Sequence, residues 1–312
     1  MKNNNFIKRQ SAITVKRFIL LPLVFMLAAG CGSSAPSPTD IAAPPSTESP
    51  SPIKTTAPPA TQPVTPTTGA TATLPGTDTN APQSNIITGQ HSFTAQAGDR
   101  NYLLFLPSNY GKDPAQKWPL ILFLHGSGTS STNTDMLLYE ALPQILGFTP
   151  DFPFIVLSPQ LTGKPGDEYW FQDKVEASVF SLLDEVTAAY AVDTTRIYLT
   201  GVSIGGNGVW EYGLRHPDSF AALAPVMGFV GDTAGFHVPT NICSLKDKPI
   251  WAFHGAVDTI VPLEAEQSLV DALKACNGNI QFTVYSDGDH DISGKVYQDQ
   301  ELYTWMLAQS LK

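Results

Sequence analysis

From about residue 90 onward, short apolar runs alternate with longer segments in which apolar residues recur every three or four positions. Continuous apolar runs are typical of strands covered on both faces, and the longer period is typical of amphipathic helices. Helices are predicted over 135–146, 173–190, 263–275 and 297–309, with a further one directly after residue 203, and strands over 91–97, 102–107, 118–125, 154–158, 196–200, 220–227, 249–254 and 280–285. This alternation predicts a mainly parallel sheet with helices on both faces, which begins with an antiparallel pair joined at Gly98-Asp99.

The first 31 residues have a different pattern. Five Lys and Arg residues precede an apolar run over 18–29, which is too short and too asymmetric in charge for an ordinary spanning helix and is typical of a secretory signal. The run ends at Leu27-Ala28-Ala29-Gly30-Cys31, which resembles a bacterial lipobox, where the cysteine is lipidated. We expect a lipoprotein signal peptide over 1–31 and a protein anchored outside the cytoplasm, at the cell surface or in the periplasm, through Cys31. Secretion without lipid and an uncleaved anchor are the alternatives.

Residues 32–84 hold 12 of the 26 prolines of the chain among Ser, Thr and Ala, with very few large apolar residues. Such a segment buries too little surface to fold, so we expect a disordered linker there and a single folded domain over 85–312. Without residues 1–31 the chain loses five positive and no negative charges, and its net charge falls from −10 to −15. This acidity excludes nucleic acid as an expected partner.

Cys243 and Cys276 form an even pair in a chain that we expect to be exported. A disulfide between them is predicted, with two buried thiols as the alternative.

The sequence holds no HExxH, no CxxC and no phosphate-binding glycine loop. Asp287, Asp289 and Asp291 resemble the start of a calcium loop, but Ile292 occupies the required glycine position and Gln298 that of the closing glutamate. We therefore expect neither a metal nor a cofactor.

The strand predicted over 196–200 leads into Gly201-Val-Ser203-Ile-Gly205, which fits the G-x-S-x-G nucleophile elbow. In that motif a sharp turn between strand and helix exposes the serine hydroxyl, and the next backbone N–H, here that of Ile204, faces the developing oxyanion. Ser203 is the predicted nucleophile. A helix N-cap is the alternative role for this serine.

Two further strand ends carry the partners that a serine nucleophile requires. Asp258 follows the strand over 249–254, and His290 follows the last strand, so the three residues come in the order Ser, Asp, His. We expect His290 to be the base and Asp258 to orient it, with Asp232 or Asp289 as alternative acids. Ser127, in the loop after the strand over 118–125, is expected to give the second oxyanion donor.

Five segments of the chain resemble esterases of the prolyl-oligopeptidase and dienelactone-hydrolase type, many of which are described as peptidases or phospholipase/carboxylesterases. They are Phe123 to Gly128, Arg196 to Gly206, Pro217 to Pro225, Trp251 to Asp258 and Phe282 to His290. The resemblance covers about residues 90–310 and implies the α/β-hydrolase fold, with Ser203 as nucleophile, Asp258 as acid and His290 as base. Such sequences often have Trp after the histidine, whereas Asp291-Ile292-Ser293 follows here.

Two residues are candidates for shaping the substrate pocket. Trp170 lies in a loop on the catalytic side, where it could line a pocket or pack in the core, and Ile292 stands near His290. The sequence favours a cofactor-independent serine esterase acting on a small-molecule or polysaccharide-linked ester. A peptidase with the same triad and a non-catalytic surface binding protein are the alternatives.

Overall fold

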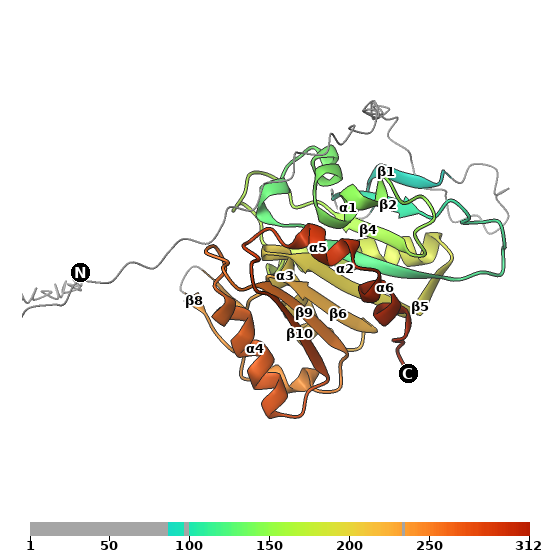
Figure 1. Ribbon diagram of the computed structural model, residues 1–312. Coiled ribbons are helices and arrows are strands. Elements are labelled where there is room, and N and C mark those ends of the chain that lie inside the picture. The colour runs from blue at the N-terminus through green and yellow to red at the C-terminus, as the bar shows by residue number, and fades with distance from the viewer. Residues whose placement is uncertain (1–86, 97–99, 233–234) are drawn as a thin grey trace, which may run out of the picture. The chain divides into compact units, whose positions relative to one another are not determined.

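The computed structural model describes residues 87–96, 100–232 and 235–312 (Figure 1). The predicted signal peptide, Cys31, the linker and the turn at Gly98-Asp99 lie outside the described residues. No helix in the described part is both long and apolar enough to cross a membrane.

An eight-stranded sheet organises the domain, with its strands in the order β1-β2-β4-β3-β5-β6-β9-β10. β2 pairs antiparallel with β1 and with β4, and every other pair in this sheet is parallel. The strands are β1 (Gly89–Thr94), β2 (Asn101–Leu106), β3 (Trp118–Leu124), β4 (Ile155–Pro159), β5 (Val192–Val202), β6 (Ala222–Val226), β9 (Ile250–Gly255) and β10 (Ile280–Tyr285). A mainly parallel sheet that begins with an antiparallel pair is therefore confirmed.

Helices alternate with these strands along the chain, as the sequence pattern predicts. They are α1 (Ala141–Leu146), α2 (Asp173–Ala189), α3 (Ile204–Arg215), α4 (Leu263–Ala275), α5 (Ser293–Gln298) and α6 (Gln300–Leu307), with 3-10 helices η1 (Ser127–Thr129), η2 (Thr134–Tyr139) and η3 (Ile242–Leu245). A two-stranded ribbon, β7 (Gly231–Asp232) and β8 (Gly235–Phe236), lies in the loop after β6, where the sequence predicts no strand.

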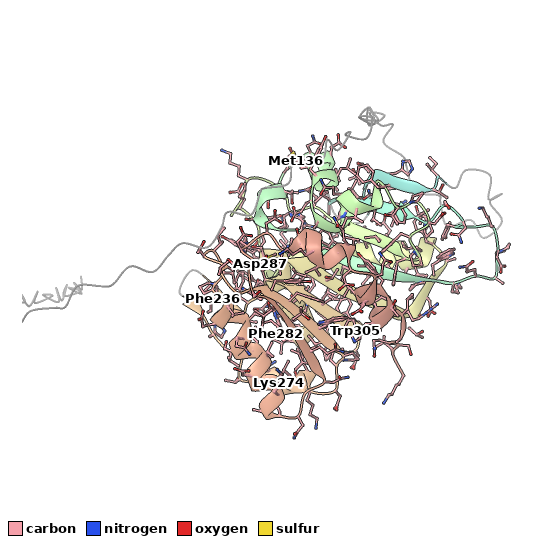
Figure 2. The ribbon with its side chains drawn as sticks, in the orientation of Figure 1. Met136, Phe236, Lys274, Phe282, Asp287 and Trp305 are labelled. Carbon is pink, nitrogen blue, oxygen red and sulfur yellow. A yellow bond between two sulfur atoms is a disulfide. The ribbon has the colours of Figure 1, made fainter. Side chains whose placement is uncertain are left out.

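The sheet separates two hydrophobic cores. Alternate residues of β3 belong to different cores, Leu122 to one and Phe123 to the other, because successive side chains of a strand point to opposite faces. The first core includes residues of α2, α3 and α4, and the second includes residues of α1, α5 and α6. Figure 1 shows α5 and α6 in front of the strands, and in Figure 2 Trp305 of α6 lies there, edge to face with Trp251 of β9 at 5.6 Å between ring centroids. Helices therefore cover both faces of the sheet.

Two predicted helices are interrupted in the structure. The helix predicted over 135–146 is divided into η2 and α1 at Glu140, whose backbone is extended with φ −120° and ψ 132°. The helix predicted over 297–309 is divided at Asp299, whose carboxylate accepts the backbone N–H of Glu301 and caps α6. The capping bond of Asp299 competes with a continuous helix, and after Glu140 the residue Pro143 lacks the N–H that a continuous helix would need.

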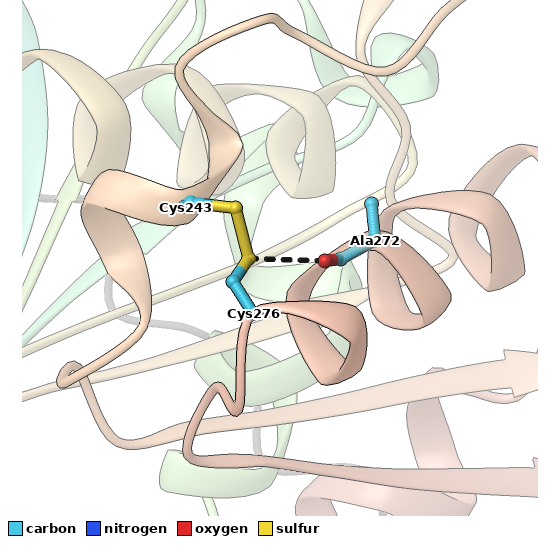
Figure 3. The surroundings of a disulfide bond; sticks show 3 residues. All are labelled: Cys243, Ala272 and Cys276. Atoms are coloured by element: carbon cyan, nitrogen blue, oxygen red, sulfur yellow. Dashed lines mark hydrogen bonds between the residues drawn. A yellow bond between two sulfur atoms is a disulfide. The ribbon is translucent and has the colours of Figure 1, made fainter.

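A disulfide joins Cys243 of η3 to Cys276 at the end of α4 (Figure 3). The two Cα atoms lie 5.9 Å apart, within the ordinary range for this bond. The bond joins the loop after the β7–β8 ribbon to α4, which packs against β9.

Candidate active site

Ser203 lies at the turn between β5 and α3, in a backbone conformation that L-residues rarely adopt, with φ 57° and ψ −117°. Its side chain makes no capping bond to α3, so the alternative role as an N-cap is wrong. A Cβ on Gly205 would lie 2.0 Å from the backbone oxygen of Leu124, and one on Gly201 would lie 2.6 Å from that same atom. The two glycines of the motif are therefore required so that α3 can begin directly against β3.

A chain of hydrogen bonds leads from Ser203 into the interior. The Ser203 Oγ lies 3.0 Å from His290 Nε2, and His290 Nδ1 lies 2.7 Å from Asp258 Oδ2. Because an ionised carboxylate only accepts, Nδ1 carries the imidazole proton and Nε2 is free to accept the serine proton. The structure thus brings together all three residues that the sequence nominates, at the carboxyl ends of β5, β9 and β10.

Asp258 is held from two sides. Its side chain is fully buried, and its Oδ1 accepts the backbone N–H groups of Ile260 at 2.8 Å and Val261 at 2.9 Å. The alternative acid Asp289 instead accepts the backbone N–H of Asp291 within its own turn. The side chain of Asp232, the other alternative, lies outside the described residues.

The two predicted oxyanion donors each begin a helix. Ser127 is the first residue of η1 and Ile204 is the first residue of α3. The first N–H groups of a helix have no partner inside it, and the dipole of α3 favours negative charge at this end. Both residues are therefore suited to donate backbone N–H groups to an oxyanion.

Glu140, which no sequence pattern marks as functional, holds the loop that carries Ser127. Its Oε1 accepts the Gly126 N–H at 2.7 Å, and its Oε2 accepts the Thr129 hydroxyl, so one carboxylate joins both ends of η1. Burial raises the pKa of this carboxyl, although the two hydrogen bonds act in the opposite direction. The break between η2 and α1 is what turns Glu140 toward the loop.

His125 fixes the same loop from below as a neutral imidazole. Its Nε2 accepts the Leu161 N–H at 2.9 Å, so the proton lies on Nδ1, which donates to the Gly126 carbonyl at 2.6 Å. Burial lowers the pKa of His125 to about 4, which agrees with a neutral ring. His125 is therefore a structural support and does not contact Ser203.

A cavity of about 270 Å³ opens above Ser203. Five segments of the chain line it, and two carboxylates and the apolar side chains of Val202 and Met227 lie among small and polar residues. The lining residues are Gly126, Ser127, Gly128, Glu140, Val202, Ser203, Met227, His290, Asp291 and Ser293.

The two predicted pocket residues lie elsewhere. Trp170 is fully buried in the first core, and its indole N–H donates to the His125 carbonyl at 3.0 Å. Ile292 is fully buried in the second core. Neither lines the cavity, so the role of pocket wall is corrected: Trp170 packs against His125, with ring centroids 5.1 Å apart, and Ile292 packs in the second core.

The parallel sheet with its antiparallel start, the two helical layers and the order Ser, Asp, His at strand ends define the α/β-hydrolase fold. The chain has the α/β-hydrolase fold. Within it, residues 167–305, which run from before α2 into α6, match the family described as Phospholipase/Carboxylesterase.

The chain is similar in sequence or structure to several known hydrolases. A "Putative carboxymethylenebutenolidase" of Salmonella typhimurium is 30% identical over 154 residues, which are 44% of this chain and 57% of that protein. The "Bifunctional acetylxylan esterase/xylanase XynS20E" of Neocallimastix patriciarum is 24% identical over 216 residues, 67% of this chain and 28% of that protein. A crystal structure described as a thermostable esterase has a TM-score of 0.56 at 28% identity and covers 71% of this chain and 62% of its own. The chain spans little more than half the length of the Salmonella relative.

Proposed function

We propose that the chain is a serine hydrolase that cleaves carboxylic esters through an acyl-enzyme intermediate. The observation that carries the proposal is the hydrogen-bonded series Ser203, His290 and Asp258 beneath an open cavity. The similarity to carboxylesterase-type proteins supports the same reaction.

In the proposed reaction the Ser203 Oγ attacks the acyl carbon while His290 Nε2 takes the hydroxyl proton. Asp258 stabilises the imidazolium, and the backbone N–H groups of Ser127 and Ile204 stabilise the oxyanion of the tetrahedral intermediate. His290 then gives the proton to the departing alcohol. Water, activated by the same imidazole, releases the acid and restores Ser203. Each oxyanion donor contributes about 3 kcal/mol to transition-state stabilisation.

The test of this proposal is covalent labelling by a fluorophosphonate probe. Wild-type protein should be labelled and should hydrolyse short-chain esters, and Ser203→Ala should do neither. Ser293→Ala is the matched control, because Ser293 lines the same cavity but donates to Asp291 at 3.2 Å. Folded wild type that resists the probe would refute the proposal.

The substrate class is proposed as a small-molecule or polysaccharide-linked ester. The likeness to a protein described as an acetylxylan esterase supports an alcohol portion rich in hydroxyl groups. The Asp291 carboxylate in the cavity lining can accept a hydrogen bond from such a hydroxyl group. A panel of acetylated sugars, feruloyl esters, alkyl esters and matched peptide amides, with Ser203→Ala as blank, distinguishes these substrates. Turnover of amides at rates equal to the esters would favour a peptidase instead.

We also propose that Cys31 anchors the enzyme to a membrane outside the cytoplasm, on the strength of the lipobox-like sequence before it. Cells fed an alkyne-labelled fatty acid should incorporate it into the wild type. They should not incorporate it into Cys31→Ser, which should also leave the membrane fraction. Equal labelling of both proteins would contradict the anchor.

A further inference from the structure

A second imidazole and a second carboxylate lie directly behind Asp258, and the reaction described above does not use them. His254 ends β9 and Glu266 lies in the first turn of α4, and both side chains are completely buried. His254 Nδ1 lies 2.7 Å from Glu266 Oε2. Two buried ionisable groups require a reason, because desolvation makes each costly unless it is paired.

The surrounding contacts determine where the protons lie. Glu266 Oε1 accepts the Trp210 indole N–H at 3.2 Å, so this carboxyl group is held from α3 as well as from β9. His254 Nε2 lies 2.9 Å from the carbonyl oxygen of Val261, which can only accept, so Nε2 carries a proton. This holds whether the proton between His254 and Glu266 is on the imidazole or on the carboxyl.

The pKa shifts of the two groups agree with a direct hydrogen bond between them. Burial raises the pKa of Glu266 to about 7, while its hydrogen bond to His254 acts against that rise. Burial acts to lower the pKa of His254, but the hydrogen bond and charge of Glu266 outweigh it, and the pKa is raised. The pair therefore keeps its contacts near neutral pH.

The Nε2 proton of His254 acts on the turn that carries Asp258. Val261 donates its N–H to Asp258 Oδ1 and accepts from His254 with its carbonyl, so its peptide groups link the two side chains. His254 Nε2 also lies 3.5 Å from Asp258 Oδ2, the oxygen that accepts from His290. The position of the Asp258 carboxylate is thus tied to the orientation of the His254 ring.

We propose that His254 is a positioning residue for the reaction: its Nε2–H fixes the turn from Asp258 to Val261, and Glu266 fixes the His254 ring. The inference rests on the proposed function, since it assigns a role within the same site. Neither residue reaches the cavity, so both act only through Asp258 and His290.

The test distinguishes the contributions of the two ring nitrogens of His254. A glutamine amide can take the place of Nε2, and an asparagine amide can take the place of Nδ1 only. Both His254→Gln and His254→Asn are made in a Glu266→Gln background, so that no unpaired carboxylate is left buried. Glu264→Gln, an exposed change in the same turn of α4, is the matched control.

The asparagine variant should lose about tenfold to hundredfold in kcat, because small displacements of catalytic groups cost this much, while KM changes by less than about threefold. The glutamine variant should stay within about threefold of Glu266→Gln alone. Rates are expressed per fluorophosphonate-reactive site, so unfolded protein does not count. Equal kcat for the two variants would overturn the inference, since a role in packing or stability alone would affect them alike.

A second measurement needs no variant. In protein with ¹⁵N-labelled histidine, the nitrogen shifts of the wild type should show a protonated Nε2 for His254 at neutral pH, and an unprotonated Nε2 would overturn the inference. The two proposals fail differently. Unlabelled Ser203 in folded wild type refutes the proposed function, whereas labelled wild type with indistinguishable His254 variants refutes only the positioning role.

Discussion

Glu140 offers a sharp test of how the loop of Ser127, the proposed oxyanion donor, is held in place. Replacing it with alanine removes the acceptor of the Gly126 N–H and one acceptor of the Thr129 hydroxyl, which still lies 3.3 Å from the Gly126 carbonyl oxygen. The Gly126 N–H left without a partner costs about 1–3 kcal/mol, which destabilises the folded conformation of the loop. If the loop relaxes, the Ser127 donor is lost, and loss of one such donor lowers kcat by about a hundredfold to a thousandfold.

Glu140→Gln separates the hydrogen bonds from the charge. The amide oxygen can still accept from Gly126, and the hydroxyl of Thr129 can turn to accept from the amide nitrogen. We expect Glu140→Gln to keep kcat within about tenfold and Glu140→Ala to lose about a hundredfold or more, measured with a soluble acyl ester. Fluorophosphonate titration counts the folded sites. A folded Glu140→Ala enzyme with wild-type kcat would refute the idea that this carboxylate holds the loop.

Three further predictions concern stability. The pKa of His125 is lower in the folded protein than in the unfolded chain, so the unfolded chain binds a proton first as the pH falls. The free energy of unfolding, measured by urea titration, should therefore drop by about 3 kcal/mol between pH 6.5 and 4. This drop should be absent in His125→Asn. Removal of the disulfide by Cys243→Ser with Cys276→Ser, 33 positions apart, should cost about 4 kcal/mol and leave kcat unchanged; equal melting temperatures in both proteins would contradict this. Gly205→Ala should abolish activity or folding because its Cβ would collide with a main-chain oxygen of β3, whereas Gly294→Ala, with open space around it, should behave as wild type in both assays.

The sheet and the place of the functional residues at its edge could be predicted from the sequence, because both depend on local sequence patterns. Buried parallel strands are continuous apolar runs, and parallel strands place their carboxyl ends at one edge, so Ser203, Asp258 and His290 could be expected to meet there. The glycines beside Ser203 give a further local signal, since only glycine fits where α3 begins against β3.

The roles of Trp170 and Glu140 could not be predicted from the sequence, because they depend on contacts between residues far apart in the chain. Trp170 was equally suited to a pocket or a core, and the choice follows from its bond to the His125 carbonyl, 45 positions away in sequence. Nothing near Glu140 marks it as different from its neighbours in a helical pattern, because its partners belong to an earlier loop. The roles of Trp170 and Glu140 therefore become visible only once the chain is folded.

The backbone of Ser203 also limits how stable this protein can become. A non-glycine residue at φ 57° and ψ −117° carries about 1–3 kcal/mol of strain, and the hydrogen bonds around it must sustain that strain in every folded molecule. Glycine would relieve the strain, yet it lacks the hydroxyl that the proposed reaction requires. The proposed reaction therefore keeps the fold below the stability that the same sequence could reach with glycine at this turn.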